Sequence, residues 1–125
     1  MNQKNEPIAI IGMGCKFPGN GNNPDQFWEN ILEEKDSITE IPKDRWNINR
    51  YYDSNSKKRG KTRAKWGGFL DKIAEFDAEF FGISPREASL LDPQQRLLLE
   101  VTHEAFEDAG LPTESLAGKN VKALN

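Results

Sequence analysis

The sequence predicts an α/β fold, and three stretches of the chain support that prediction. An apolar run from Ile8 to Met13, closed by Gly14, fits a short strand buried on both faces, as in a parallel sheet. Residues 23–35 and 84–110 combine helix start signals with the spacing of amphipathic helices. A buried strand together with amphipathic helices indicates a sheet that helices cover.

The turn after the first strand contains two glycines, Gly12 and Gly14, that could also begin a dinucleotide-binding fingerprint. The third glycine of that fingerprint would fall at Phe17, and no helix start follows directly. The pattern therefore favours a tight turn that leaves a central strand, and it disfavours a nucleotide site.

The first helix is expected to begin at Asn23, whose side chain can cap it, with Pro24 in the first helical position. Lys35 at its far end suits the negative pole of the helix dipole. Its apolar residues recur at helical spacing and are expected to form a buried stripe: Phe27, Trp28, Ile31 and Leu32.

Residues 36–76 show no sustained periodicity, and proline, asparagine and glycine punctuate them. We interpret them as a long surface loop, although a structureless loop of this length is rare in a self-contained domain. Four large aromatic residues predict that the loop packs against other structure: Trp46, Tyr51, Tyr52 and Trp66.

Within this loop, six of the nine residues 57–65 are basic: Lys57, Lys58, Arg59, Lys61, Arg63 and Lys65. A solvated surface is the default interpretation of such a run. A nucleic-acid site would need more basic surface, and the net charge of −3 disfavours it. The remaining alternative is electrostatic steering of an acidic protein partner.

Residues 80–110 predict two helices placed end to end. Ser84 before Pro85, with Glu87 three residues after the serine, forms the pattern of a capping box. Asp92 before Pro93 repeats the start signal, so the first helix must end there. Just upstream, residues 77–82 predict one capped helical turn closed by glycine.

The second of these helices is expected to be amphipathic and about 25 Å long. Its core-facing residues are expected to be Leu98, Val101, Thr102, Ala105 and Ala109. Its solvated face is expected to carry Arg96, Glu100, His103, Glu104 and Glu107. Gly110 predicts a left-handed stop, and Pro112 prevents the helix from resuming.

Bulk composition limits the function classes. The 125 residues suit one domain, with 36% hydrophobic and 30% charged residues, which predicts an incomplete core. A single cysteine excludes an internal disulfide, as in a reducing compartment. No signal peptide and no apolar run of about 20 residues is present. We therefore expect a soluble, cytoplasmic chain without membrane or nucleic-acid partners.

Several segments together resemble β-ketoacyl synthases, above all the ketosynthase domain of modular type I polyketide synthases. The resemblance rests on FFGISPREA at 80–88, LDPQQRLLLE at 91–100, EPIAIIGMGC at 6–15, FPG at 17–19 and KWGGFL at 65–70. It covers residues 6–118, in order and without large gaps. Residues 1–5 are interpreted as a tail and residues 119–125 as a divergent end.

The resemblance implies the N-terminal part of a thiolase-like α/β fold, with layered helices around a mixed sheet. It implies decarboxylative Claisen condensation of acyl thioesters, delivered on the phosphopantetheine of an acyl carrier protein. Complete members are homodimers that work with the other synthase domains and bind no cofactor directly. The cysteine and two histidines that act in the family lie beyond the residues matched here. No catalytic, cofactor-binding or metal-binding residue is therefore carried over onto this sequence.

Two residues could still suggest chemistry, Cys15 and His103. Cys15 follows the first strand and is expected to be a small structural hydrophobe, not a nucleophile. His103 is expected to be a solvated helix residue among glutamates. One cysteine and one histidine cannot complete a four-ligand zinc site.

Two functions remain open at this point. The chain is either the opening part of a ketosynthase that is inactive alone, or a non-catalytic module that docks on a synthase or an acyl carrier protein. A sheet of fewer than three strands is rarely stable by itself. The sequence offers one convincing strand, which favours the first alternative.

Overall fold

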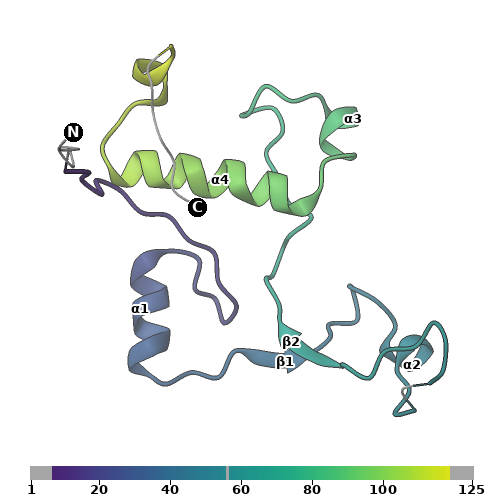
Figure 1. The fold of residues 1–125 in the computed structure, drawn as a ribbon. Coiled ribbons are helices and arrows are strands. Elements are labelled where there is room, and N and C mark those ends of the chain that lie inside the picture. The colour runs from purple at the N-terminus through teal and green to yellow at the C-terminus, as the bar shows by residue number, and fades with distance from the viewer. Residues whose placement is uncertain (1–6, 56, 119–125) are drawn as a thin grey trace, which may run out of the picture. The chain divides into compact units, whose positions relative to one another are not determined.

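The computed structural model describes residues 7–55 and 57–118, and the chain forms two compact units (Figure 1). One unit is discontinuous and consists of Met1–Cys15 and Phe76–Asn125; the other is Lys16–Glu75. The elements follow in the order α1 (Pro24–Leu32), β1 (Ile38–Glu40), α2 (Ile48–Tyr51), β2 (Trp66–Gly68), α3 (Pro85–Ala88), α4 (Pro93–Asp108) and the 3₁₀ helix η1 (Thr113–Leu116).

Helix α4 is the longest element of the described chain, with 16 residues and a length of about 24 Å. The side chain of Asp92 caps its start by accepting a 2.8 Å hydrogen bond from the N–H of Gln94. Pro93 occupies the first turn, where a missing N–H costs nothing. The predicted start and length of the second helix are therefore confirmed.

The end of α4 is a Schellman motif. Gly110 has a φ of 64°, a left-handed conformation that glycine adopts without strain. The N–H of Gly110 donates to the carbonyl of Glu107, and the N–H of Leu111 donates to the carbonyl of Phe106, each at 2.9 Å. The predicted glycine stop is thus confirmed with both of its hydrogen bonds.

The first of the two predicted helices forms as α3 and is short. The side chain of Ser84 accepts a 3.3 Å hydrogen bond from the N–H of Glu87, and Pro85 follows in the first turn. The helix ends after Ala88, well before the stop imposed at Asp92. The predicted start is confirmed, but the helix is a single turn and not the longer helix expected up to Asp92.

The capped turn expected at residues 77–82 is also present. The side chain of Asp77 accepts a 3.0 Å hydrogen bond from the N–H of Phe80. Gly82 closes the turn with a φ of 64°, and its N–H donates to the carbonyl of Glu79 at 2.9 Å. The turn places the aromatic residues of this stretch against α4, as described below.

The strand predicted over residues 8–13 is not formed, so this prediction was wrong. The only sheet among the described residues pairs β1 with β2, and residues 8–13 join neither. The apolar side chains of this segment stay open, with Ile8 exposed at 81% and Ile10 at 79%. An apolar run alone does not make a strand, because its backbone groups also need a neighbouring strand to pair with.

The same segment nevertheless has a fixed place on α4, which Figure 1 shows running beside it. A Cβ on Gly12 would lie 2.8 Å from the Cβ of Ala109, and a Cβ on Gly14 would lie 2.5 Å from the carbonyl oxygen of Val101. Both distances are closer than real side chains approach. Because the two glycines carry no side chain, the backbone of this segment can pack closely on α4. This contact supports the interpretation of Gly12 and Gly14 as a tight turn and not as part of a nucleotide site.

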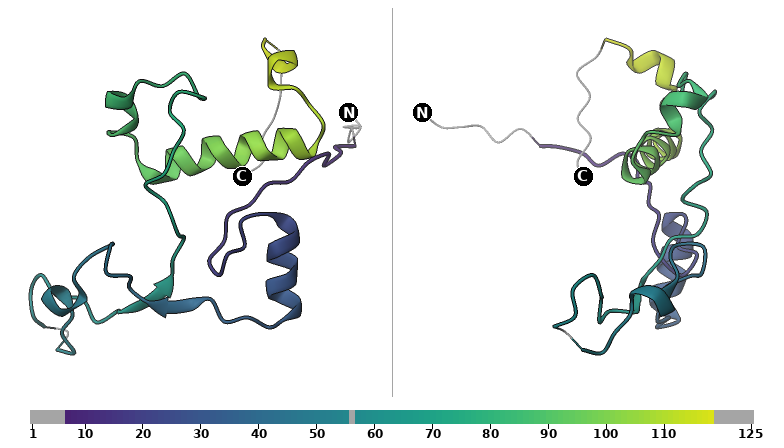
Figure 2. Two further views of the ribbon diagram at one scale, coloured as in Figure 1. Left: turned by 180° about the vertical axis from the view of Figure 1, so that it is seen from behind. Right: turned by 90° about the vertical axis from the view of Figure 1, so that its right-hand side faces the viewer.

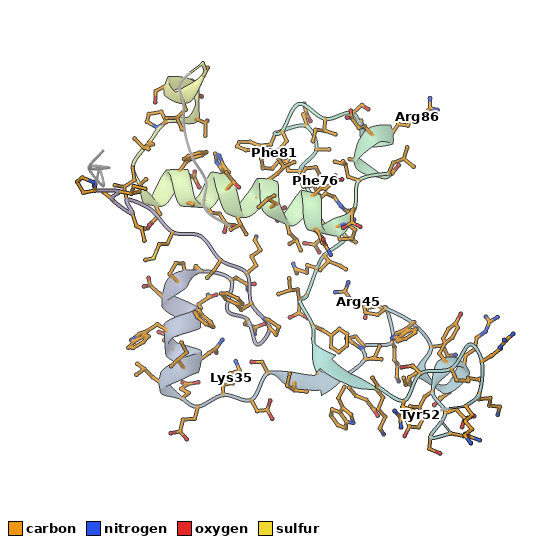
Figure 3. The ribbon with its side chains drawn as sticks, in the orientation of Figure 1. Lys35, Arg45, Tyr52, Phe76, Phe81 and Arg86 are labelled. Carbon is orange, nitrogen blue, oxygen red and sulfur yellow. The ribbon has the colours of Figure 1, made fainter. Side chains whose placement is uncertain are left out.

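Helix α1 begins where the sequence predicted. The side chain of Asn23 accepts a 2.9 Å hydrogen bond from the N–H of Gln26, with Pro24 in the first turn. Beyond the helix end, the ammonium group of Lys35 donates a 2.8 Å hydrogen bond to the carbonyl of Gly19 (Figure 3). Lys35 thus ties the loop before α1 to the residues after it.

The buried stripe expected on α1 is largely open to solvent. Trp28 is exposed at 59% and Leu32 at 65%. Of the four residues, Phe27 is half-buried, and its ring lies 4.3 Å from that of Phe17. The expectation of burial was wrong because no described segment of this unit covers the stripe, although the amphipathic pattern itself is real.

Residues 36–76 are not a structureless loop, which corrects the prediction. Strands β1 and β2 lie side by side and pair antiparallel (Figure 2). Their register places Ile38 opposite Gly68 and Glu40 opposite Trp66. Helix α2 lies between them in the sequence. Elements of three or four residues are too short to establish a periodicity, so sequence patterns miss them.

The aromatic residues of this region do not pack against other structure as predicted, since Trp66 is exposed at 59% and the ring contacts lie within the region itself. The rings of Trp46 and Tyr51 stack with centroids 5.3 Å apart. Nearby, the guanidinium of Arg45 donates to the carbonyl of Leu70, which ties the residues after β2 to those before α2. These local contacts order the region without a large core.

Burial is sparse throughout the described residues. Ile41 is the only apolar residue among them that is buried, at 9% exposure. This agrees with the incomplete core that the composition predicted. No helix within residues 7–55 and 57–118 has both the length and the apolar character to cross a membrane. The divergent end predicted at 119–125 and the tail at 1–5 lie outside the described residues.

Candidate functional site

Cys15, the only thiol of the chain, lies half-buried at the end of the segment that packs on α4. Burial raises the pKa of its thiol, and the carboxylate of Glu104 raises it further. A raised pKa lowers the fraction of thiolate, which is the nucleophilic form of cysteine. The surroundings of Cys15 therefore oppose the activation that a nucleophile requires.

His103 is not the solvated residue that its place among glutamates predicted. Its side chain is 24% exposed, and its ring meets the rings of Phe80 and Phe81 edge-on, with centroids 4.8 and 6.3 Å away. Its Nε2 lies 3.4 Å from a carboxylate oxygen of Glu107, one turn further on. The prediction failed because the turn over residues 77–82 covers this side of α4, and helical spacing cannot show such a contact.

The same side of α4 bears an open groove of about 780 Å³. Figure 3 shows Phe81, which lines this groove, and Phe76 close to the ribbon of α4. Aromatic and aliphatic side chains dominate its lining: Phe80, Phe81, Leu91, Leu98, Leu99 and Phe106. The ionisable residues in the lining are Glu87, Glu114 and His103. The groove can therefore hold apolar groups, but it contains no cysteine, serine or lysine that could attack a thioester.

The structure does not bring Cys15 and His103 together in this groove, since His103 lines it and Cys15 does not. Among residues 7–55 and 57–118, no cluster of three histidine, cysteine, aspartate or glutamate side chains could hold a metal ion.

A second surface is the basic segment, defined as residues 57–65. Three of its cations already have acceptors within the chain. Lys58 pairs with Asp53 at 2.8 Å, Lys65 pairs with Glu40 at 3.0 Å, and Lys61 donates to the carbonyl of Arg50. Among the described residues, Lys57, Arg59 and Arg63 form no ion pair, and all three are exposed.

The ion pair between Lys58 and Asp53 shifts the pKa of both groups. The hydrogen bond from Lys58 lowers the pKa of Asp53, and the backbone N–H of Asn55 contributes in the same direction. The carboxylate in turn raises the pKa of Lys58. The pair lies at the surface, with the Lys58 side chain exposed and the Asp53 side chain half-buried, so it sets local charge and adds little to stability.

Comparison with known proteins identifies the family of this chain. The model of the β-ketoacyl synthase N-terminal domain matches residues 5–124. The chain belongs to the β-ketoacyl synthase family. The resemblance seen in the sequence is thereby confirmed, and the segments that carry it are distributed over both units of this ketosynthase segment.

The curated relatives of the ketosynthase segment are polyketide synthases. It is 49% identical over 113 residues to one component of the phenolphthiocerol/phthiocerol polyketide synthase of Mycobacterium tuberculosis, covering 90% of the chain and 6% of that protein. It is 53% identical over 112 residues to the phthioceranic/hydroxyphthioceranic acid synthase of Mycobacterium bovis, covering 90% of the chain and 5% of that protein. The chain thus spans a small fraction of the relatives it matches.

Solved ketosynthases share the fold of this segment. The oxazolomycin ketosynthase domain of Streptomyces albus superposes with a TM-score of 0.83 at 39% identity, over 90% of this chain and 20% of that one. The ketosynthase from module 6 of the bacillaene synthase of Bacillus subtilis gives 0.74 at 40% identity, over 86% of this chain and 18% of that one. The chain is therefore the N-terminal portion of a thiolase-like ketosynthase domain of the polyketide synthase type.

Proposed function

We propose that this chain supplies the N-terminal scaffold of a ketosynthase that joins acyl units by decarboxylative Claisen condensation. The match of residues 5–124 to the ketosynthase N-terminal domain is the observation that carries the proposal. The polyketide synthases among its relatives favour substrates that are acyl thioesters on the phosphopantetheine of an acyl carrier protein.

In this reaction a cysteine thiolate first attacks the acyl thioester on the carrier protein, and the acyl chain moves to the cysteine as the phosphopantetheine thiolate leaves. A malonyl thioester then loses carbon dioxide, and the resulting carbanion attacks the acyl carbonyl. The new carbon–carbon bond forms as the carbon–sulfur bond to the cysteine breaks, and the thiolate is restored. Donors that stabilise the developing oxyanion lower the barrier. We propose that the remainder of the ketosynthase domain contributes these groups.

The residues present here contribute structure to that domain. Gly12 and Gly14 seat the first segment on α4, and this leaves Ile8 and Ile10 facing outward. An exposed apolar segment fixed against a helix is suited to pair with neighbouring strands of a larger sheet. In this proposal, the open stripe of α1 and the groove on α4 are likewise covered by other parts of the domain.

The proposal assigns no catalytic role to Cys15 or His103. Burial and Glu104 raise the pKa of the Cys15 thiol and so favour its protonated form, and His103 is packed against aromatic rings. Neither residue shares a site with the other groups that thioester chemistry requires.

A chimera tests this function directly. Residues 6–118 replace the matching segment of an active polyketide-synthase ketosynthase, and condensation is measured with acyl and malonyl carrier proteins. We expect condensation by the chimera, and the same rate when Cys15 is changed to Ala. The 125-residue chain alone serves as a control and should give no product. Turnover by that chain alone, or transfer of an acyl group to Cys15, would show the proposal to be wrong.

The alternative is a non-catalytic module that docks on a synthase or a carrier protein, and the exposed basic segment is the observation in its favour. A docking module must fold by itself. Dispersed amide signals and a cooperative unfolding transition of the chain alone, with an inactive chimera, would select this alternative. Broad signals with an active chimera would select the scaffold role.

A further inference from the structure

We infer that Asn20 is a modification site, at which the chain converts its own asparagine to aspartate and isoaspartate. Asn20 is the one asparagine of the sequence that glycine follows, and it lies in the turn over residues 18–20, just before α1 (Figure 1). Gly21 has no Cβ, so it leaves room for the ring through which this reaction passes. The reaction needs water and no enzyme, and the local structure therefore decides whether it takes place.

The atoms of the reaction come from the chain and from water. The backbone nitrogen of Gly21 loses its proton and attacks Cγ of Asn20, which closes a succinimide ring. The carbon–nitrogen bond of the side-chain amide breaks, and its nitrogen leaves as ammonia with that proton. Water then opens the ring and returns a proton to the nitrogen of Gly21. Opening at Cγ gives aspartate, and opening at the backbone carbonyl gives isoaspartate, whose backbone is longer by one carbon atom.

Both reacting groups are available in the structure. The side chain of Asn20 is exposed, and its amide makes no hydrogen bond to any described residue. The carbonyl of Gly21 accepts a 2.8 Å hydrogen bond from the N–H of Phe17, whereas the N–H of Gly21 donates to none of the residues described. No hydrogen bond therefore has to break before the nitrogen of Gly21 turns toward the side chain of Asn20.

The turn that contains Asn20 is bonded to α1 and to the residues after it. The carbonyl of Gly19 accepts hydrogen bonds from Nζ of Lys35 at 2.8 Å and from Nδ2 of Asn30 at 3.0 Å. A Cβ on Gly19 would collide with Oγ of Ser37, so the backbone has no spare room here. The additional backbone carbon of isoaspartate should therefore displace the turn and break these bonds. Aspartate keeps the backbone length and adds only a negative charge.

Nearby asparagines provide controls within the same stretch of chain. Asn23 is followed by Pro24, whose nitrogen carries no proton and cannot close the ring. Asn30 lies within α1, and its amide is bonded to the carbonyl of Gly19. Asn22 is exposed but is followed by a residue with a side chain. If exposure alone governed the reaction, Asn22 would be converted as fast as Asn20.

The test follows the reaction in the chimera that contains residues 6–118, whose folded state is checked by a cooperative urea transition, and in the full chain. After incubation at mildly alkaline pH, trypsin releases residues 17–35, and tandem mass spectrometry reports each asparagine in this peptide. In the folded chimera we expect Asn20 to be converted about tenfold faster than Asn22, Asn23 or Asn30. The folded chimera is compared with the same chimera in urea, because Gly21 is buried and burial could slow the loss of its proton.

Two substitutions separate the chemistry from its effect on the turn. Gly21→Ala should slow the conversion about tenfold, because a Cβ hinders ring closure. That Cβ would lie 3.3 Å from Nδ2 of Asn30, a side-chain atom that can move, so the turn should tolerate alanine. Asn20→Gly removes the amide and suits the φ of 63°. Hydrogen exchange of the Phe17 amide should become faster as isoaspartate accumulates, and should stay slow in Asn20→Gly and Asn20→Asp.

Three results would overturn the inference. Conversion of Asn20 only in urea would show that the folded turn protects it. Equal rates for Asn20 and Asn22, or an equal rate after Gly21→Ala, would show that the glycine does not direct the reaction. A folded chimera that converts Asn20 but forms no carbon–carbon bond would count against the proposed function and leave this modification site standing.

Discussion

The backbone N–H of Met13 donates a 2.9 Å hydrogen bond to Oδ2 of Asp108, across 95 residues of sequence. This bond and the close approach of Gly12 and Gly14 hold the first segment on the last turns of α4. The contact joins the two parts of the discontinuous unit. Substitutions at its residues should therefore separate these parts most directly.

Changing Gly12 to Val should separate the first segment from α4. A Cβ at this position would lie 2.8 Å from that of Ala109 and 2.9 Å from its backbone nitrogen, so the segment must move. We expect a loss of about 1–3 kcal/mol in the free energy of unfolding of the chimera. Hydrogen exchange of the Met13 amide should become faster in parallel. Met13→Leu is the control, because it nearly conserves the side-chain volume and keeps the N–H that donates to Asp108.

Changing Gly110 to Ala should weaken the end of α4. The left-handed φ of 64° costs a residue with a Cβ about 1–2 kcal/mol, and no atom crowds the position. Gly110→Asn is the matched variant, since asparagine tolerates this conformation better. Exchange rates of the Gly110 and Leu111 amides report the effect. Equal rates in the two variants would mean that backbone strain does not govern this helix end.

Changing His103 to Ala should loosen the turn over residues 77–82. The imidazole meets Phe80 and Phe81 edge-on, and its removal leaves these rings without that contact. We expect a loss of about 1–2 kcal/mol in the chimera, and recovery of most of it in His103→Phe, which restores an aromatic contact. Urea titration measures both variants. If alanine and phenylalanine gave the same midpoint, the ring contacts would not contribute to stability.

The Cys15 thiol should react slowly with iodoacetamide near neutral pH. Burial, and then Glu104, raise its pKa above the ordinary value, so the reaction rate should rise only at higher pH than for a free cysteine. Glu104→Gln should shift the rate profile to lower pH, whereas Glu107→Gln, next to His103, should not. Because the folded pKa is raised, the protonated thiol contributes stability below the pKa of the unfolded chain. That contribution is lost as pH rises through the folded pKa.

Local rules predicted the starts of α1, α3 and α4 and the end of α4. Asn23, Asp92 and Gly110 act on atoms within a few residues of themselves, so the sequence contains all the information that fixes them. The same holds for the turn from Asp77 to Gly82. The short pair β1 and β2 was missed because three-residue strands carry too little pattern.

Predictions that depended on distant contacts were less successful. The apolar residues 8–13 and the apolar stripe of α1 are not covered by other described residues. Their hydrophobic pattern therefore predicted burial that the structure does not show. His103 was misplaced for the opposite reason, because a turn distant in sequence covers it. The ion pairs of Lys58 with Asp53 and of Lys65 with Glu40 could not be predicted from the sequence either. A run of basic residues does not show which of its charges have an acidic partner.

The discontinuity of the first unit also fixes an order of events during synthesis. The unit Lys16–Glu75 has been synthesised before α4 begins, whereas Met13 must wait 95 residues for Asp108. At ordinary translation rates that delay is about 5–20 seconds. During this interval Gly12 and Gly14 have no helix to pack on, and the isoleucine-rich segment before them is a target for chaperones that bind exposed apolar sequence.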